Sequence, residues 1–255
     1  MSAPSLQRRW PQVAKVISTS ASSLRIPVVS RDPQASWTAE GAEIALSDQA
    51  IEEVSVNFRA LKGLTVLSNE LLADSSPEAA ALVGDGLARD IANKLDSTFF
   101  GTRVAHGPDG LGSLSGIQSV DAGVVANLDP FHEAISLAET VGAQTGAFVT
   151  SPAVALALAK IKVGAGSNTP LLGQDPTAPT RRTIAGISLL VSAAVEADTV
   201  WAIPAARAIV GMRQDVQVVS DKSAFFSSDR TAIRAVLRAG FAFPHVEAIV
   251  KVATA

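Results

Sequence analysis

The chain has 255 residues, enough to bury a large core as one domain or two, and it has no cysteine, which excludes disulfides and thiolate metal sites. Hydrophobic residues make up 47% of the sequence, yet no apolar run approaches the roughly 20 residues of a membrane-spanning helix. This combination favours extensive contact between subunits over a membrane location. The net charge is −3, but residues 1–31 contain only basic charges, at five positions.

Residues 1–23 are polar, rich in serine and free of acids, and we expect them to form an extended arm. The same composition is typical of an organelle transit peptide, of a segment that lies on a neighbouring subunit or near nucleic acid, and of an ordinary solvated terminus. It is not typical of a secretory signal, because no continuous apolar stretch follows the arginines.

The next segment predicts an extended hairpin. Residues 23–29 are typical of a strand, and Pro27 favours an edge position. Residues 30–50 are rich in turn-forming residues. Residues 52–61 alternate between apolar and polar, which predicts a half-buried strand. Its apolar face carries Val54, Val56, Phe58 and Ala60. Because a two-stranded hairpin is marginal in water, this face must rest on another part of the protein.

The stretch LTVLSNELLADSSPEAAALV, residues 64–83, raises the question of what Glu70 does. A carboxylate after an apolar run could be a general acid or base. The alternative is a one-turn structural joint, in which Ser68 caps the turn and Glu70 accepts backbone donors or pairs with a basic residue. No second carboxylate, histidine or metal cluster stands beside Glu70, and this favours the joint.

Residues 76–99 predict a long helix. Ser76 suits the N-cap, Pro77 the first helical position and Glu78 the positive end of the helix dipole. An apolar residue at every fourth position predicts one buried stripe, and at 1.5 Å per residue the helix is roughly 35 Å long. The stripe consists of Val83, Leu87, Ile91, Leu95 and Phe99. A Gly-rich loop follows over residues 101–116.

From about residue 128 the pattern changes to short alternating helices and strands. Asp129 and Pro130 predict the N-cap and first position of one helix, and Ser151 and Pro152 predict the same start for another, after a strand. Residues 164–182 are typical of a loop. Strands are predicted over residues 183–192, 199–204 and 206–212, as two long strands over 215–244, and as a closing strand over 247–254.

No motif that carries chemistry is present. The glycine-rich segments lack the spacing of a phosphate loop, a dinucleotide turn or a nucleophile elbow, and there is no HExxH pair or acidic metal loop. His106, His132 and His245 show no metal-ligand spacing. A catalytic triad assembled from distant residues stays open. The residues therefore predict no catalytic site, no cofactor and no metal.

The order of these features resembles the HK97-like major capsid proteins of tailed bacteriophages. Those proteins carry a similar tryptophan–glutamate–glycine element, a similar S-x-E-L-L-x-D-S joint and a similar helix that ends in an aromatic–glycine pair. Residues 184–192, 206–212 and 231–252 resemble the closing run of the family. The matching residues in the first half are Trp37, Glu40, Gly41, Ser47, Asp48, Ser68, Glu70, Leu71, Leu72, Asp74, Ser75, Phe100 and Gly101.

The resemblance implies an α+β, HK97-like capsid fold in four parts. Residues 1–23 would form an N-terminal arm, and residues 24–62 an extended loop, a hairpin that reaches over a neighbouring subunit. Residues 63–127 and 211–247 would form a peripheral domain with the long spine helix and the long strands. Residues 128–210 and 248–255 would form an axial domain around the five-fold and six-fold centres.

The resemblance also implies a structural subunit, not an enzyme, that self-assembles into an icosahedral capsid enclosing double-stranded DNA. Its partners would be copies of itself in pentamers and hexamers, and a portal. Because the sequence starts directly in the arm, its scaffold would be a separate scaffolding protein, or none would be needed. It would assemble in the host cytoplasm and end in the virion, with no membrane contact. Two alternatives stay open: an encapsulin-like compartment that holds cargo enzymes, and a free-standing hydrolase.

The loop and the arm hold the candidate contact residues. Trp37 is an apolar anchor beside two acids, and basic residues near the loop base are available to pair acids across a contact. Some relatives join lysine to asparagine between subunits, but no lysine lies within residues 32–50, so such a cross-link is not expected. The candidates for contact between subunits are Arg31, Trp37, Glu40, Glu43, Arg59 and Lys62. The candidates for weak, non-specific contact with DNA are Arg8, Arg9 and Lys15.

Overall fold

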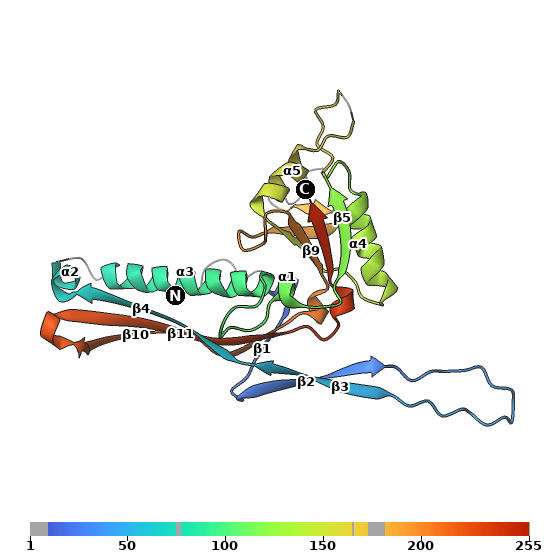
Figure 1. The fold of residues 1–255 in the computed structure, drawn as a ribbon, viewed down its shortest axis with the longest axis horizontal. Coiled ribbons are helices and arrows are strands. Elements are labelled where there is room, and N and C mark those ends of the chain that lie inside the picture. The colour runs from blue at the N-terminus through green and yellow to red at the C-terminus, as the bar shows by residue number, and fades with distance from the viewer. Residues whose placement is uncertain (1–9, 75–77, 165, 173–181, 255) are drawn as a thin grey trace.

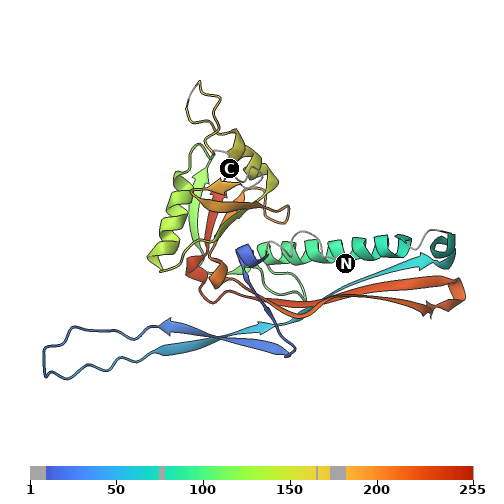
Figure 2. The same ribbon diagram turned by 180° about the vertical axis from the view of Figure 1, so that it is seen from behind.

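The structure is a computed structural model that describes residues 10–74, 78–164, 166–172 and 182–254. A long sheet beside a long helix forms the body, which extends to the left in Figure 1, and a two-stranded hairpin extends to the right. A second sheet with two helices stands above the region where these parts meet, as the view from behind also shows (Figure 2). Among the described residues, no helix is both long enough and apolar enough to cross a membrane.

The body contains a four-stranded sheet. Its strands are β1 (Lys15–Ser18), β10 (Ile209–Phe225), β11 (Arg230–Ala242) and β4 (Arg59–Ser68), in that order across the sheet. β10 and β11 form a long antiparallel hairpin, β4 pairs antiparallel with β11, and β1 pairs parallel with β10. The two long strands expected over residues 215–244 are confirmed, although β10 begins earlier.

Helix α3 (Glu78–Phe100) lies along this sheet and confirms the long helix expected over residues 76–99 (Figure 1). Ile91 and Phe99 are 2% and 0% exposed, and Leu87 is partly buried beside Ile91. The expected capping residues Ser76 and Pro77 lie outside the described residues. The sheet contributes Leu61, Val216, Ala235, Leu237 and Ala239 to the layer beneath the helix.

The second sheet has six strands. In order they are β5 (Gln118–Gly123), β12 (Val250–Thr254), β9 (Thr199–Ile203), β6 (Ala147–Thr150), β8 (Ile187–Val191) and β7 (Thr183–Ile184). The sheet is mixed, because β12 pairs parallel with β5 and antiparallel with β9. Helices α4 (Asp129–Thr140) and α5 (Pro152–Lys160) share its core. Phe131 and Phe148 meet edge to face there, with 5.5 Å between ring centroids.

The two helix starts in this part differ in how well local signals predict them. Ser151 caps α5 as expected, since its Oγ accepts a hydrogen bond from the Val154 N–H at 3.3 Å. The expected N-cap at Asp129 is wrong by one residue, because α4 begins at Asp129 and Leu128 occupies the cap position. The Asn127 side chain accepts from the Asp129 N–H at 3.2 Å and donates to its carboxylate, and so takes the role expected of Asp129.

β2 (Ser23–Arg31) and β3 (Ala50–Asn57) form the projecting hairpin as a separate two-stranded sheet, and Pro27 lies on an edge as expected. The single strand expected over residues 52–61 is wrong. The chain changes sheets at Phe58, because β3 pairs with β2 whereas β4 pairs with β11. Val56 is fully buried as predicted, but Ala60 is exposed.

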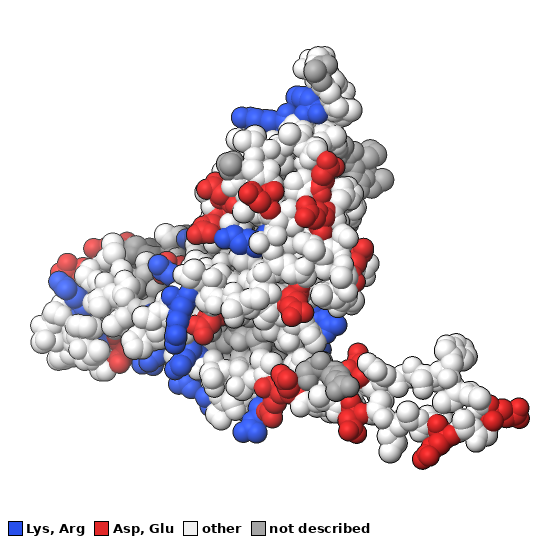
Figure 3. All heavy atoms as spheres, turned by 45° about the vertical axis from the view of Figure 1, so that its right-hand side comes forward, with Lys and Arg blue, Asp and Glu red and all other residues white. Residues whose placement is uncertain are grey.

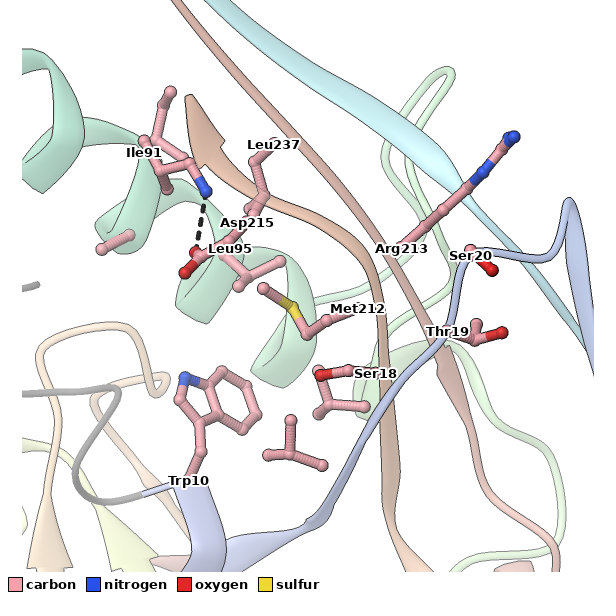
Figure 4. Close-up of a pocket in the computed structure, with 14 residues that line it drawn as sticks. Trp10, Ser18, Thr19, Ser20, Ile91, Leu95, Met212, Arg213, Asp215 and Leu237 are labelled. Atoms are coloured by element: carbon pink, nitrogen blue, oxygen red, sulfur yellow. Dashed lines mark hydrogen bonds between the residues drawn. The ribbon is translucent and has the colours of Figure 1, made fainter. Parts of the chain in front are cut away.

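Residues 10–18 do not form an extended arm, so the expectation for residues 1–23 is wrong there. Trp10 and Val13 of helix α1 (Trp10–Val13) are buried, as is Ala14, and β1 follows the helix into the sheet. The cause is aromatic packing: the rings of Trp10 and Phe241 meet Phe99 edge to face, with centroids 4.7 and 5.1 Å from it. Figure 4 shows Trp10 beside a groove between α3 and β10.

Sheet pairing also shifts the expected boundaries of the four parts. β1 and the start of β4 belong to the four-stranded sheet, not to the arm and the loop. β5 belongs to the six-stranded sheet, not to the peripheral part over residues 63–127, because it pairs with β12. That partner comes from the other end of the chain, so no local signal marks the boundary. The division into four parts, corrected in this way, stays a prediction.

The remaining elements are short. They are α2 (Asn69–Asp74) between β4 and α3, and the 3-10 turns η1 (Leu111–Ser113), η2 (Ala205–Arg207), η3 (Phe226–Ser228) and η4 (Val246–Ala248).

Candidate functional site

The tip of the extended loop projects into solvent. Trp37, Ile44 and Leu46 are 106%, 74% and 101% exposed, although they are large apolar side chains. Local hydrogen bonds order the tip: the Gln34 N–H donates to Ser47 Oγ at 3.0 Å across the loop. A large apolar side chain that is fully exposed marks a surface suited to association. The structure therefore places Trp37 where a partner could cover it.

The loop is also strongly acidic. Residues 32–58 contain acids and no lysine or arginine, and Figure 3 shows acidic side chains gathered at the far end of the hairpin. Glu53 pairs with Arg25 on β2 at 3.3 Å, but both side chains are well exposed and the pair is weak. The loop beyond Arg31 therefore carries a net negative charge. The acids are Asp32, Glu40, Glu43, Asp48, Glu52 and Glu53.

The base of the hairpin is fixed to the body by close packing over two glycines. Gly211 of β10 and Gly240 of β11 lie directly opposite each other in the sheet. A Cβ on Gly240 would lie 2.7 Å from both the Asn57 carbonyl oxygen and Val56 Cγ1. A Cβ on Gly211 would lie 2.8 Å from the Phe58 ring. The glycine pair therefore makes the space in which β3 crosses the sheet and Val56 becomes fully buried.

A row of basic residues lines the face of the four-stranded sheet that is opposite α3. Leu237 and Gly63 face the helix, so the alternation of β11 and β4 turns Arg234, Arg238 and Lys62 to the other side. Lys62 and Arg234 are exposed, and Arg238 is half-buried. Figure 3 shows basic side chains gathered on the body toward the base of the hairpin.

The joint between β4 and α3 is held by Asn69, not by Glu70. The side-chain amide of Asn69 donates to the Asp229 carboxylate at 2.6 Å, and the Thr231 hydroxyl donates to the side-chain oxygen Oδ1 of Asn69. Ser68 caps the turn as expected, because its Oγ accepts from the Leu71 N–H at 3.2 Å. Glu70 is exposed on α2. These contacts support the structural interpretation of this stretch.

The other candidate residues are distributed over the molecule. Arg31 ends β2 opposite Ala50, and Arg59 is exposed at the start of β4. Lys15 is exposed on β1, where its N–H donates to the Ala208 carbonyl at 2.8 Å, so it belongs to the folded body. Arg8 and Arg9 lie outside the described residues. Within the described part of the chain, no three His, Cys, Asp or Glu residues are grouped as a metal site.

The model of the Phage capsid family matches residues 11–254. The chain belongs to the phage capsid family. A solved structure from Mycobacterium phage Adephagia has the same fold, with a TM-score of 0.78 at 16% identity over 95% of this chain and 88% of that one. A solved structure from Microbacterium phage Oxtober96 has a TM-score of 0.77 at 16% identity, over 96% of this chain and 90% of that one. The capsid of an empty GTA particle, computed with C5 symmetry, has a TM-score of 0.76 at 19% identity, over 100% of this chain and 91% of that one. No curated protein sequence matches the chain.

Membership in this family makes the chain a structural subunit of a phage capsid. Its place is the virion, where it joins copies of itself in a shell of capsomers. The encapsulin-like alternative is not favoured, because the family that matches nearly the whole chain is that of phage capsids.

Sequence reasoning missed the glycine pair, Asn69 and the basic row on the sheet. No role is predicted from the sequence for Gly211 and Gly240, although a glycine within a strand is a known signal of close backbone approach. Asn69 has partners 160 and 162 positions away, which no local pattern shows. Arg234 and Arg238 repeat at a spacing of four on one strand, which predicts a shared face once the strand is known.

Replacing Gly240 with Ala tests the crossing. The new Cβ would collide with backbone at Asn57, so we expect a loss of about 1–3 kcal/mol in the free energy of unfolding, measured by urea denaturation. Gly164→Ala is the matched control, because a Cβ added there would meet no atom within 4 Å. Equal stability of the two variants would contradict the close packing described here.

Asn69→Ala and Glu70→Gln together test the joint. Loss of Asn69 leaves the Thr231 hydroxyl, on a residue that is 3% exposed, without its partner, so we expect a cost of about 1–3 kcal/mol in thermal or urea unfolding. Glu70→Gln changes an exposed side chain, and we expect a shift within about 0.5 kcal/mol. A larger loss of stability in Glu70→Gln than in Asn69→Ala would show that Glu70 holds the joint.

Proposed function

We propose that this subunit forms a closed icosahedral shell of pentamers and hexamers that encloses double-stranded DNA. The observation that carries the proposal is the extended loop: its base is fixed to the body, while no part of the chain that the structure describes covers its apolar and acidic tip. An arm of this kind is suited to reach a second copy. Repetition of the contact around a symmetric ring closes an assembly.

The contact would be centred on Trp37. Burial of a tryptophan at the centre of an interface often contributes about 2 kcal/mol or more to binding, and charged neighbours form a polar rim around it. Glu40 and Glu43 would supply the acidic side of this rim. The basic side would come from the adjacent copy, through Arg31, Arg59 or Lys62 and the basic row that Arg234 and Arg238 extend on the sheet.

Contact with the genome would be weak and non-specific. Affinity for duplex DNA depends on cationic contacts to phosphate, and a chain with a net charge of −3 is not suited to coat the genome tightly. Any direct contact would come from Arg8, Arg9 and Lys15 near the N-terminus. Assembly in the host cytoplasm, a portal and a separate scaffolding protein stay predictions of the family resemblance, as does the absence of enzymatic activity.

The DNA proposal is tested with the free subunit and a fluorescent duplex. We expect no tight binding at roughly 0.2 M salt, and weak binding at roughly 0.05 M that is lost when Arg8, Arg9 and Lys15 are all changed to Gln. The matched control changes three other exposed basic residues, Lys160, Lys162 and Arg182, to Gln. Tight binding at the higher salt concentration, or equal losses in both triple variants, would refute the assignment.

The loop proposal is tested by replacing residues 33–48 with a short Gly-Ser turn. The subunit should keep its fold, because both larger sheets and α3 are untouched, and circular dichroism checks this. Closed shells should disappear in negative-stain microscopy, because the contact between copies is lost. Trp37→Ala should also weaken assembly, while Trp37→Phe, which keeps an aromatic anchor, should retain more of it. Normal shells from the loop replacement would refute the proposal.

A further inference from the structure

A buried carboxyl lies where the spine helix meets the six-stranded sheet. Asp96, near the end of α3, is 2% exposed. It borders a cavity of about 20 Å³, and the other residues around this cavity carry no charge. They come from α1, the end of α3, β6 and the end of β8, so the site lies between the two helices and the six-stranded sheet. These residues are Trp10, Val13, Phe100, Val149, Leu190, Val191 and Ser192.

The carboxyl has no compensating partner in the described part of the chain, where no hydrogen bond or ion pair reaches it. Burial without a partner disfavours the charged form, and desolvation raises the pKa of Asp96 from 3.8 to about 7. An ordinary aspartate is fully ionised at neutral pH. Asp96 instead changes charge close to neutral pH, inside the contact between two structural units.

The described elements around this site bring no charged group that perturbs Asp96. Helix α1, β6 and β8 contain no charged residue, and Glu196 beyond β8 is exposed. On α3 itself, Asp90 and Lys94 are exposed. Arg8 and Arg9 precede α1 in the sequence and lie outside the described residues. Among the described residues, desolvation is thus the effect that decides the charge of Asp96.

We propose that Asp96 is a proton-operated latch between the spine helix and the six-stranded sheet: the neutral carboxyl lets α3, α1 and β8 pack closed, and ionisation loosens this contact. The sign follows from linkage. Below pH 4 the carboxyl is protonated in both the folded and the unfolded chain. As the pH rises from about 4 to about 7, only the unfolded chain releases the proton freely, so the stability of the closed contact falls and then levels off above pH 7.

The latch is a property of the single chain and does not depend on shell formation. If the proposed shell forms, each copy carries the same group at the same junction. A change of pH would then bias the angle between the two sheets in every copy at once.

The experiment is hydrogen–deuterium exchange of the full-length protein at pH 5.5 and pH 8.5, corrected for the intrinsic effect of pH on exchange. In the wild type we expect peptides over residues 94–100 and 188–195 to exchange about tenfold faster at the higher pH. Asp96→Asn should exchange slowly at both values, because its amide stays neutral. Asp90→Asn is the matched control on the same helix, and it should behave like the wild type.

Two results would overturn the latch. One is the same pH dependence in Asp96→Asn and the wild type. The other is a wild type whose exchange does not depend on pH; a pH-sensitive Arg8→Gln/Arg9→Gln variant would then show that an arginine neutralises Asp96. Should Asp96→Asn not fold, the infrared band of a protonated carboxyl in the wild type decides: it must be present at pH 5.5 and absent at pH 8.5, and its absence at pH 5.5 refutes the proposal.

Discussion

The crossing of β3 over the Gly211–Gly240 pair is the constraint on which the rest of the molecule depends. A two-stranded hairpin is marginal by itself, and β2 and β3 pair with no other strand in the described part of the chain. At the crossing, side-chain atoms of Val56 come within contact distance of both glycine positions, and Val56 is completely buried. This contact gives the hairpin a fixed direction relative to the body. Without it, the tip around Trp37 would sample many positions, and the entropy of fixing it would oppose association.

A second contact, around Phe99, fixes the two sheets to each other. Its neighbour Phe100 and the distant residues Trp10, Phe241 and Phe243 surround this ring. The same cluster includes Val149, Trp201 and Ile203 of the six-stranded sheet. Trp10, Val13 and Ala14 are therefore part of the core, although the polar composition of this region suggested a free arm. Asp96 lies one turn before Phe99 on the same helix. Among the described residues that line the cavity, Asp96 is the titratable group, so the apolar packing holds the junction together while the carboxyl modulates the contact.

The sequence predicts what depends on neighbours in the chain and misses what depends on distant ones. The Ser151–Pro152 helix start, the spine helix and the two long strands follow from caps and periodicity, and the structure confirms them. The sheet change at Phe58, the burial of Trp10 and the pairing of β5 with β12 depend on partners far along the chain. For the same reason Glu70, the prominent residue of its stretch, is peripheral, while Asn69 beside it holds the joint.

The architecture separates the residues that stabilise the subunit from those that are available for association. Stability comes from the glycine crossing, the Phe99 cluster and the layer beneath α3, all of which are buried. The loop tip contributes almost no buried area, because Trp37 and Leu46 are fully exposed. Apolar area contributes roughly 25 cal/mol per Å² of free energy only when it leaves water. The tip therefore adds little to the stability of the lone chain and much to the free energy of a contact between chains. The free energy of assembly can therefore change with the tip sequence while the fold stays intact, which is what a subunit needs if it must fold before it assembles.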